Sequence, residues 1–252
     1  MPRYPLSRPR SSYVSSFSFG PGPISTALKA IIAANVAMFV AQFFFPVLTD
    51  VLGLVPVFVL RYVWVWQLAT YMFLHGGIFH IAFNMLALWM FGAELERVWG
   101  TRYFLKFYFV TGIGAAALTV LFSLVPFAFA QQLQHANVIG ASGAIYGLLL
   151  AYAMYFPDRP IYMYFVFPIP ARIFVAIIGA IAFFSSMNEA SGVANATHLG
   201  GLLVAYLFLK SARVHPLSEL KYRYLKWKTN RGRRKFDVYS GGRANDIDRR
   251  VH

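Results

Sequence analysis

The 252-residue chain is too apolar for an ordinary soluble domain, because 58% of its residues are hydrophobic, 18% are aromatic and only 13% are charged. It contains no cysteine, which excludes a disulfide framework, a thiolate metal site and a cysteine nucleophile. The net charge of +14 is concentrated at the chain ends, since 13 of the 23 Lys and Arg residues lie from Lys210 onward. Such a distribution predicts a multi-pass membrane protein with both termini in the cytoplasm and an even number of spans.

The basic ends divide the chain into three predicted parts. Residues 1–25, rich in Pro, Ser, Gly and Arg, are expected to form a flexible cytoplasmic segment rather than a cleaved signal peptide. Residues 26–210 hold the helical domain, and residues 211–252 form a basic cytoplasmic tail. A membrane-tethered tail accounts for the charge without a nucleic-acid partner, so we expect none. The tail is instead expected to meet anionic lipid headgroups, at roughly 1 kcal/mol per basic residue.

Six apolar stretches follow one another along the chain. The first two are separated by Leu48–Leu74, which is too broken for a span and whose Trp64 and Trp66 favour a loop in the outer membrane interface. A charged turn, Glu94–Arg102, follows the second span inside, and Pro126–Asn137, without Lys or Arg, is predicted outside. The expected fold class is therefore all-α, a polytopic bundle of six transmembrane helices. The predicted spans are Ala27–Val47, Ile78–Phe91, Tyr103–Val125, Val138–Pro157, Ala171–Met187 and Val193–Leu209.

Polar side chains lie near the outer starts of the second, fourth and sixth spans. The second carries His80 and Asn84 on one helix face, the fourth carries Ser142 and Tyr146, and the sixth carries His198. With a helix rise of 1.5 Å per residue, these groups are predicted to lie at nearly the same depth below the outer membrane interface. Polar groups in membrane helices face the bundle interior or a water-filled cavity, so we expect them to share one cavity.

Ser142 has two interpretations on its own. The glycines around it leave room for a close approach to its hydroxyl, as a nucleophile requires. Gly143 and Gly147 also form the small-xxx-small spacing that packs membrane helices closely, which favours a structural role.

The other polar residues favour a functional role for Ser142. An imidazole with a pKa near 6.5 can activate a serine, so Ser142 and His198 are a candidate nucleophile and base. Glu189, in the loop before the sixth span, is the nearest acid, and a dyad is therefore more economical than a triad. His80 and Asn84 either stabilise an oxyanion or form an interhelical polar contact.

Three motifs together resemble those of the rhomboid intramembrane serine proteases. They are His80-Ile-Ala-Phe-Asn84, Gly140-Ala-Ser142-Gly143 and Ala196-Thr-His198-Leu-Gly200-Gly201. The resemblance covers about Leu68–Leu209. It implies that Ser142 is the nucleophile and that His198 is the general base and then the acid.

The resemblance also implies the supporting roles. His80, Asn84 and the backbone N–H of Ser142 would stabilise the oxyanion, and Tyr146 would stack on the histidine. Glu94, followed by Gly100, resembles the acidic turn after the family's second helix, where a structural role is expected. The glycines expected to allow close helix packing are Gly140, Gly143, Gly147, Gly200 and Gly201.

Members of this family cleave single-pass membrane proteins in or beside the membrane, usually after a small residue, with water and without a cofactor or metal. By this resemblance the chain is expected to be a serine endopeptidase. The bacterial cytoplasmic membrane is its expected location, since no organelle-type presequence is evident. Arg3, Arg8 and Arg10 among serines leave a transit peptide as the second option. One departure concerns the interfacial loop, where Trp66-Gln67 replaces the family's frequent Trp-Arg and puts the loop's anchoring in question.

Two other function classes remain open at this stage. A non-catalytic relative would bind membrane-protein clients without cutting them, although such relatives typically lack the serine or the histidine. A transporter or channel would place polar groups near the membrane midplane, whereas those of this chain cluster near one face.

Overall fold

The computed structural model describes residues 23–126, 128–163, 167–186 and 192–213. The predicted N-terminal segment (apart from its last few residues), nearly all of the basic tail and Glu189 lie outside these residues. The chain divides into two compact units, Met1–Phe208 and Leu209–His252, and the first unit contains every predicted site residue.

Long helices account for most of the described chain. Within it, three helical stretches are long and apolar enough to cross a membrane, namely Thr26–Phe44, Ile78–Trp99 and Thr101–Phe122. The predicted all-α polytopic fold is confirmed, while the count of six crossings stays a prediction. The elements at the six predicted spans are α1 (Thr26–Phe44), α5 (Ile78–Ala87) with η2 (Leu88–Gly92) and α6 (Ala93–Trp99), α7 (Thr101–Phe122), α9 (Ser142–Tyr155), α10 (Ala171–Ser186) and α11 (Gly192–Arg213).

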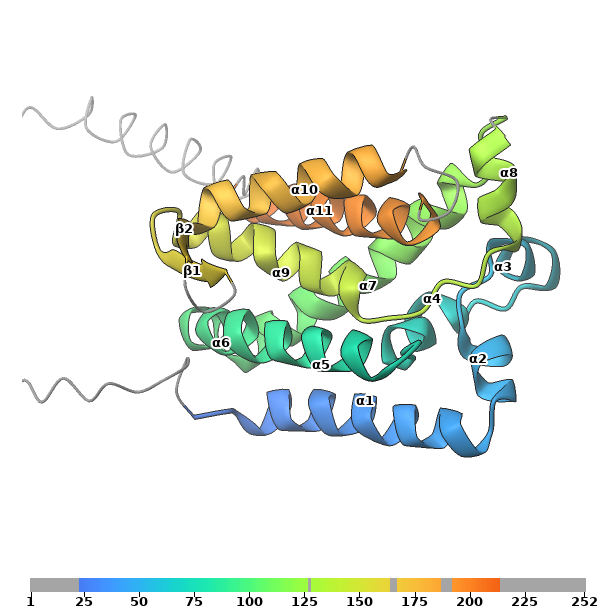
Figure 1. Cartoon of the computed structure of the whole chain (residues 1–252), viewed down its shortest axis with the longest axis horizontal. Coiled ribbons are helices and arrows are strands. Elements are labelled where there is room, and N and C mark those ends of the chain that lie inside the picture. Colours follow the sequence, from blue (N-terminus) through green and yellow to red (C-terminus); the bar gives the residue numbers. More distant parts are fainter. Residues whose placement is uncertain (1–22, 127, 164–166, 187–191, 214–252) are drawn as a thin grey trace, which may run out of the picture. The chain divides into compact units, whose positions relative to one another are not determined.

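Helix α9 is the centre of the first unit, since nine of its 14 residues are buried. It packs against α7, α10 and the α5–α6 stretch. Figure 1 shows that α5, α9 and α11 all begin at the same end of the bundle, at the right of the view. The polar residues predicted near the starts of these helices therefore lie at one end.

The predicted interfacial loop is mostly helical. It contains α2 (Val47–Leu52), α3 (Pro56–Tyr62), α4 (Gln67–Thr70) and the 3-10 turn η1 (Tyr71–Phe73). Pro56 occupies the first turn of α3, where its missing N–H has no cost. The Thr70 hydroxyl donates to the Leu52 carbonyl at 2.7 Å and ties α4 to α2.

The predicted outer loop Pro126–Asn137 also contains a helix, α8 (Ala128–His135). Ala130 and Leu133, three residues apart, are fully buried, while Gln131 and Gln132 are exposed. This amphipathic pattern stabilises a helix in a segment too polar to cross the membrane.

The helix of the second predicted span continues beyond Phe91 to Trp99, so Glu94 and Glu96 lie in the helix and the turn expected over Glu94–Arg102 is confined to its C-terminal part. Glu94 accepts a hydrogen bond from Arg159 at 2.9 Å. Because neighbouring elements satisfy this carboxylate and that of Glu96, the charges do not end the helix. The turn comes at Gly100, whose φ of 77° favours glycine.

Two other helix boundaries differ from the sequence prediction. Helix α1 ends at Phe44 rather than Val47, because Pro46 disfavours helical backbone at the residue before it. Helix α9 begins at Ser142 rather than Val138, because Val138 exchanges two backbone hydrogen bonds with Leu54, at 2.8 and 2.9 Å.

A short hairpin joins α9 to α10. Its strands are β1 (Pro160–Met163) and β2 (Phe167–Pro170), which pair antiparallel with Ile161 opposite Ile169. The sequence predicts a turn at Pro157–Pro160 but not this pairing.

Gln67 anchors the interfacial segment. The side chain is fully buried, accepts a hydrogen bond from the Val55 N–H at 3.0 Å and donates to the Val51 carbonyl at 3.2 Å. One amide thus serves as both donor and acceptor for the segment between α2 and α3. The departure from Trp-Arg therefore leaves this segment structurally anchored.

Replacing Gln67 with Leu should destabilise the fold by about 1–3 kcal/mol, because the buried Val55 N–H loses its acceptor. Thermal unfolding in detergent measures the change. Gln131→Leu, at an exposed position of α8, is the matched control and should leave the midpoint nearly unchanged. Equal midpoints for Gln67→Leu and the parent would contradict the anchoring role.

Candidate active site

Ser142 and His198 meet at the starts of two helices. Ser142 is the first residue of α9, and its Oγ lies 2.8 Å from Nε2 of His198 on α11. When Nε2 accepts the serine proton, the neutral imidazole carries its own proton on Nδ1. This is the arrangement in which a histidine takes a proton from a serine.

The Tyr146 ring lies against the same imidazole. The two ring centroids are 4.2 Å apart and the planes differ by 6°, so the rings are stacked face to face. Tyr146 stands one turn after Ser142 on α9. The stack limits rotation of the imidazole about the bond that carries it.

A contact between glycines brings α9 and α11 together. A Cβ atom built on Gly201 would overlap the carbonyl oxygen of Gly143 and lie 2.9 Å from its carbonyl carbon. Gly143 directly follows Ser142, and Gly201 lies one turn after His198. The close approach of the two backbones therefore sets the separation of the serine and the histidine.

The remaining predicted packing glycines differ in what they contact. Gly147 faces α7, where a Cβ would overlap Thr111, and a Cβ built on Gly200 would lie 3.2 Å from the Ala115 carbonyl oxygen. Gly140 precedes α9 and makes room for the ring of His80 rather than for a helix backbone. The close contact of Gly140 is thus with a side chain of α5, and its helix-packing role stays a prediction.

Thr197 orients the start of α11, a role that the sequence does not reveal. Its hydroxyl lies 2.9 Å from that of Thr119 on α7, and the Thr119 hydroxyl donates to the Ala115 carbonyl at 2.9 Å. The proton of Thr197 therefore points to Thr119. Because His198 is the next residue, this buried bond helps to fix the rotation of the helix that carries it.

The backbone before Ser142 is held from the side of η1. The Gly140 N–H donates to the Tyr71 carbonyl at 2.9 Å, and the Tyr71 hydroxyl donates to the Gly112 carbonyl of α7 at 2.8 Å. Burial raises the pKa of Tyr71 far above its ordinary value, so the phenol stays a donor. Gly140 has a φ of 124°, which a residue with a side chain rarely adopts.

The His80 ring places its Nε2 beside Gly140, near the Ser142 hydroxyl. Its Nδ1 accepts a hydrogen bond from the Gly76 N–H at 3.3 Å, so in the neutral ring the proton is on Nε2. A Cβ built on Gly140 would lie 2.7 Å from His80 Nε2 and 3.6 Å from Ser142 Oγ. The Nε2 of His80 and the hydroxyl of Ser142 thus lie close to the same side of Gly140.

Asn84 lies one turn beyond His80 and is buried. Its amide donates to the His80 carbonyl at 2.7 Å and so stays with its own helix. The second hydrogen of that amide is not used by this bond. The structure thus brings Ser142, His198, Tyr146 and His80 close together, with Asn84 one turn after His80 on α5.

Nδ1 of His198 has no hydrogen-bond acceptor among the described residues. Glu189 lies outside the described residues. No group of three or more His, Asp or Glu side chains among them is placed to hold a metal ion.

The family model of the Rhomboid domain matches residues 63–212, which is more than half of the chain. The chain belongs to the rhomboid family. The matched region includes every residue of the site described above. Helix α1 lies outside it.

Several curated proteins are similar to this rhomboid chain. "Rhomboid protease GluP" of Bacillus subtilis is 37% identical over 140 residues, covering 55% of this chain and 24% of that protein. "Rhomboid protein 1, mitochondrial" of Saccharomyces cerevisiae is 34% identical over 143 residues, covering 54% of this chain and 38% of that protein. "Rhomboid protease AarA" of Providencia stuartii is 31% identical over 151 residues, covering 56% of this chain and 54% of that protein. The rhomboid chain therefore spans about half or less of the length of these relatives.

Gly201→Ala should separate α11 from α9, lengthen the bond between His198 and Ser142 and destabilise the rhomboid domain by about 1–3 kcal/mol. Gly179→Ala on α10 is the matched control, because its Cβ would meet Leu202 at an ordinary 3.5 Å. Thermal unfolding of both variants in detergent measures the difference. Similar midpoints for the two variants would show that the glycine contact does not limit the packing.

Proposed function

We propose that this rhomboid protein is an intramembrane serine endopeptidase that cleaves transmembrane segments of membrane proteins. The observation that carries the proposal is the 2.8 Å hydrogen bond between His198 Nε2 and Ser142 Oγ. Family membership supports it, because two of the matched relatives bear the name rhomboid protease.

The reaction begins when Ser142 Oγ attacks the scissile carbonyl carbon. The serine proton moves to Nε2 of His198 as the new C–O bond forms, and the carbonyl electrons move to the oxygen. Tyr146 holds the imidazole in the plane that this transfer requires. The product of the step is a tetrahedral oxyanion covalently attached to Ser142.

Three donors stabilise the oxyanion. They are the Nε2–H of His80, the second amide hydrogen of Asn84 and the backbone N–H of Ser142, which has no acceptor within α9 because it lies in the first turn. The His80 ring and the Ser142 backbone are held before the reaction, so these two donors stabilise the developing charge without reorganising. Asn84 contributes its donor after its side chain rotates from the His80 carbonyl toward Ser142.

The second half of the reaction returns the proton. Protonated His198 donates to the leaving amine as the C–N bond breaks, which leaves an acyl ester on Ser142. A water molecule then attacks the ester while His198 takes its proton, and the carboxylate product leaves. The chain's own residues and water suffice for these steps.

The substrates are single-pass membrane proteins in the surrounding lipid bilayer. A scissile carbonyl must leave its helical hydrogen bond to reach Ser142, so Gly or Pro near the cleavage site favours reaction. The protease domain, residues 26–210, lies in a bacterial cytoplasmic membrane with residues 1–25 and 211–252 in the cytoplasm. The basic tail contacts anionic headgroups there.

Labelling with a fluorophosphonate serine probe in detergent tests the activated serine. The parent should label at Ser142, as located by mass spectrometry, and Ser142→Ala should not label. His198→Ala should label at least about 100-fold more slowly, because the proton acceptor is lost. Ser123→Ala, at another buried serine, is the matched control and should label like the parent.

Failure of folded parent protein to label and to cut a generic transmembrane substrate would overturn the protease proposal. The protein would then be a non-catalytic relative that binds membrane-protein clients.

A further inference from the structure

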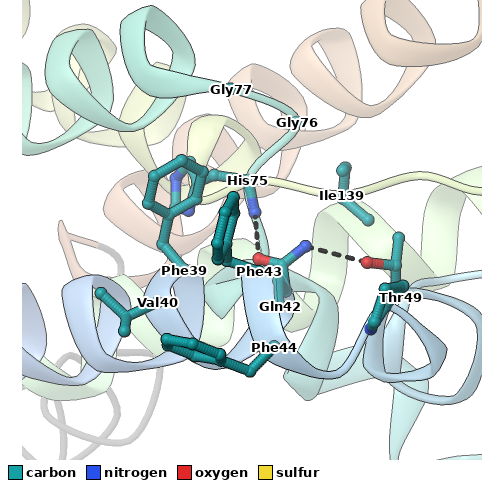
Figure 2. Close-up of a pocket in the computed structure, with 11 residues that line it drawn as sticks. Phe39, Val40, Gln42, Phe43, Phe44, Thr49, His75, Gly76, Gly77 and Ile139 are labelled. Carbon is teal, nitrogen blue, oxygen red and sulfur yellow. Dashed lines mark hydrogen bonds between the residues drawn. The ribbon is translucent and has the colours of Figure 1, made fainter.

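Gln42, near the end of α1, bonds to the segment that leads into the site. Its Oε1 accepts a hydrogen bond from the His75 N–H at 3.0 Å, and its Nε2 donates to the Thr49 hydroxyl at 3.0 Å. Figure 2 shows the amide between these two partners. The single side chain therefore links α1 to the residues just before α5.

A cavity of about 640 Å³ lies beside this link, and its lining includes Phe43, Gln42, His75, Gly76 and Ile139 (Figure 2). Side-chain packing between the end of α1 and the segment His75–Gly77 is thus incomplete. Gly76 and Gly77 have no side chains that would compensate for it. The hydrogen bond from the His75 N–H to Gln42 is a direct link between α1 and this segment beside the cavity.

The supported segment contacts His80 in two ways. The His75 ring packs on the His80 ring with centroids 5.0 Å apart and an interplanar angle of 68°. The next N–H, that of Gly76, donates to His80 Nδ1 at 3.3 Å. Adjacent backbone N–H groups are therefore bound to Gln42 and to His80 respectively.

The contact between the two histidine rings does not depend on charge. Burial, with a smaller contribution from neighbouring His80, lowers the pKa of His75 from 6.5 to about 4. His75 is therefore neutral at physiological pH. It acts on His80 by packing, and its position follows from the backbone that Gln42 holds.

We propose that Gln42 is a positioning residue for the oxyanion-stabilising His80, acting through the backbone of His75 and Gly76. The inference rests on the proposed protease function and extends the site to α1, which lies outside the matched Rhomboid domain. Gln42 keeps Nδ1 of His80 occupied as an acceptor. The donor Nε2–H then stays directed toward Gly140 and the Ser142 hydroxyl.

The test compares Gln42→Met with Gln42→Glu in turnover of a transmembrane substrate. Met has a similar length without an acceptor, and the variant should lower kcat at least about tenfold with little change in KM, because an oxyanion donor is misplaced. Glu keeps an acceptor oxygen for the His75 N–H and should restore kcat to within about threefold of the parent. Thr49→Val removes only the second bond of Gln42 and should also stay within about threefold.

A double-mutant cycle with His80 separates positioning from general stability. In the His80→Ala background, Gln42→Met should slow fluorophosphonate labelling by less than about twofold, because the group it positions is gone. All variants are compared below their unfolding temperatures. If Gln42→Met does not fold, Gln42→Asn replaces it, since its shorter side chain does not reach the His75 N–H.

Equal losses in both backgrounds, or full activity of Gln42→Met, would overturn the positioning role while leaving the protease proposal intact. A parent that neither labels nor cleaves would instead overturn the protease proposal, on which this role rests.

Discussion

The close approach of α9 and α11 is the constraint on which the site depends. Ser142 and His198 are 56 residues apart in sequence, and a hydrogen bond is worth only about 0.5–1.5 kcal/mol net. That bond alone does not hold two helices in register. The backbone contact at Gly143 and Gly201 sets the helix separation, and the hydrogen bond forms at the distance that results.

The site also depends on the backbone segments just before Ser142 and just before His80, which are held by hydrogen bonds to other parts of the chain. Val138 is paired with Leu54, and Gly140 is bonded to Tyr71, so the segment before Ser142 is held by residues of the interfacial region. Gln42 holds the segment before His80 from α1. The short helices between α1 and α5 thus form the frame of the site at the end of the bundle where α5, α9 and α11 begin.

Much of the site can be predicted from the sequence, because polar residues are rare in apolar spans and stand out at Ser142, His198 and His80. The start of α9 could not be predicted, since Val138 resembles a helical residue and is extended only through its distant partner Leu54. The role of Gln67 likewise depends on backbone groups that a local pattern does not contain. The charge of Glu94 predicts a turn, because the residue that pairs with it in the helix, Arg159, is remote in sequence. The features that the sequence does not predict therefore depend on hydrogen bonds between residues that are distant in sequence.

Cleavage in a bilayer is the most direct measurement of the central claim, that the geometry at Ser142 and His198 makes a protease. Purified parent and Ser142→Ala protein are reconstituted in proteoliposomes with a single-pass substrate that carries Gly near its outer end. The parent should produce two fragments, cut within or beside the membrane segment by mass spectrometry, and Ser142→Ala should produce none. The same fragments from both proteins, or none from well-folded parent across several such substrates, would contradict the claim.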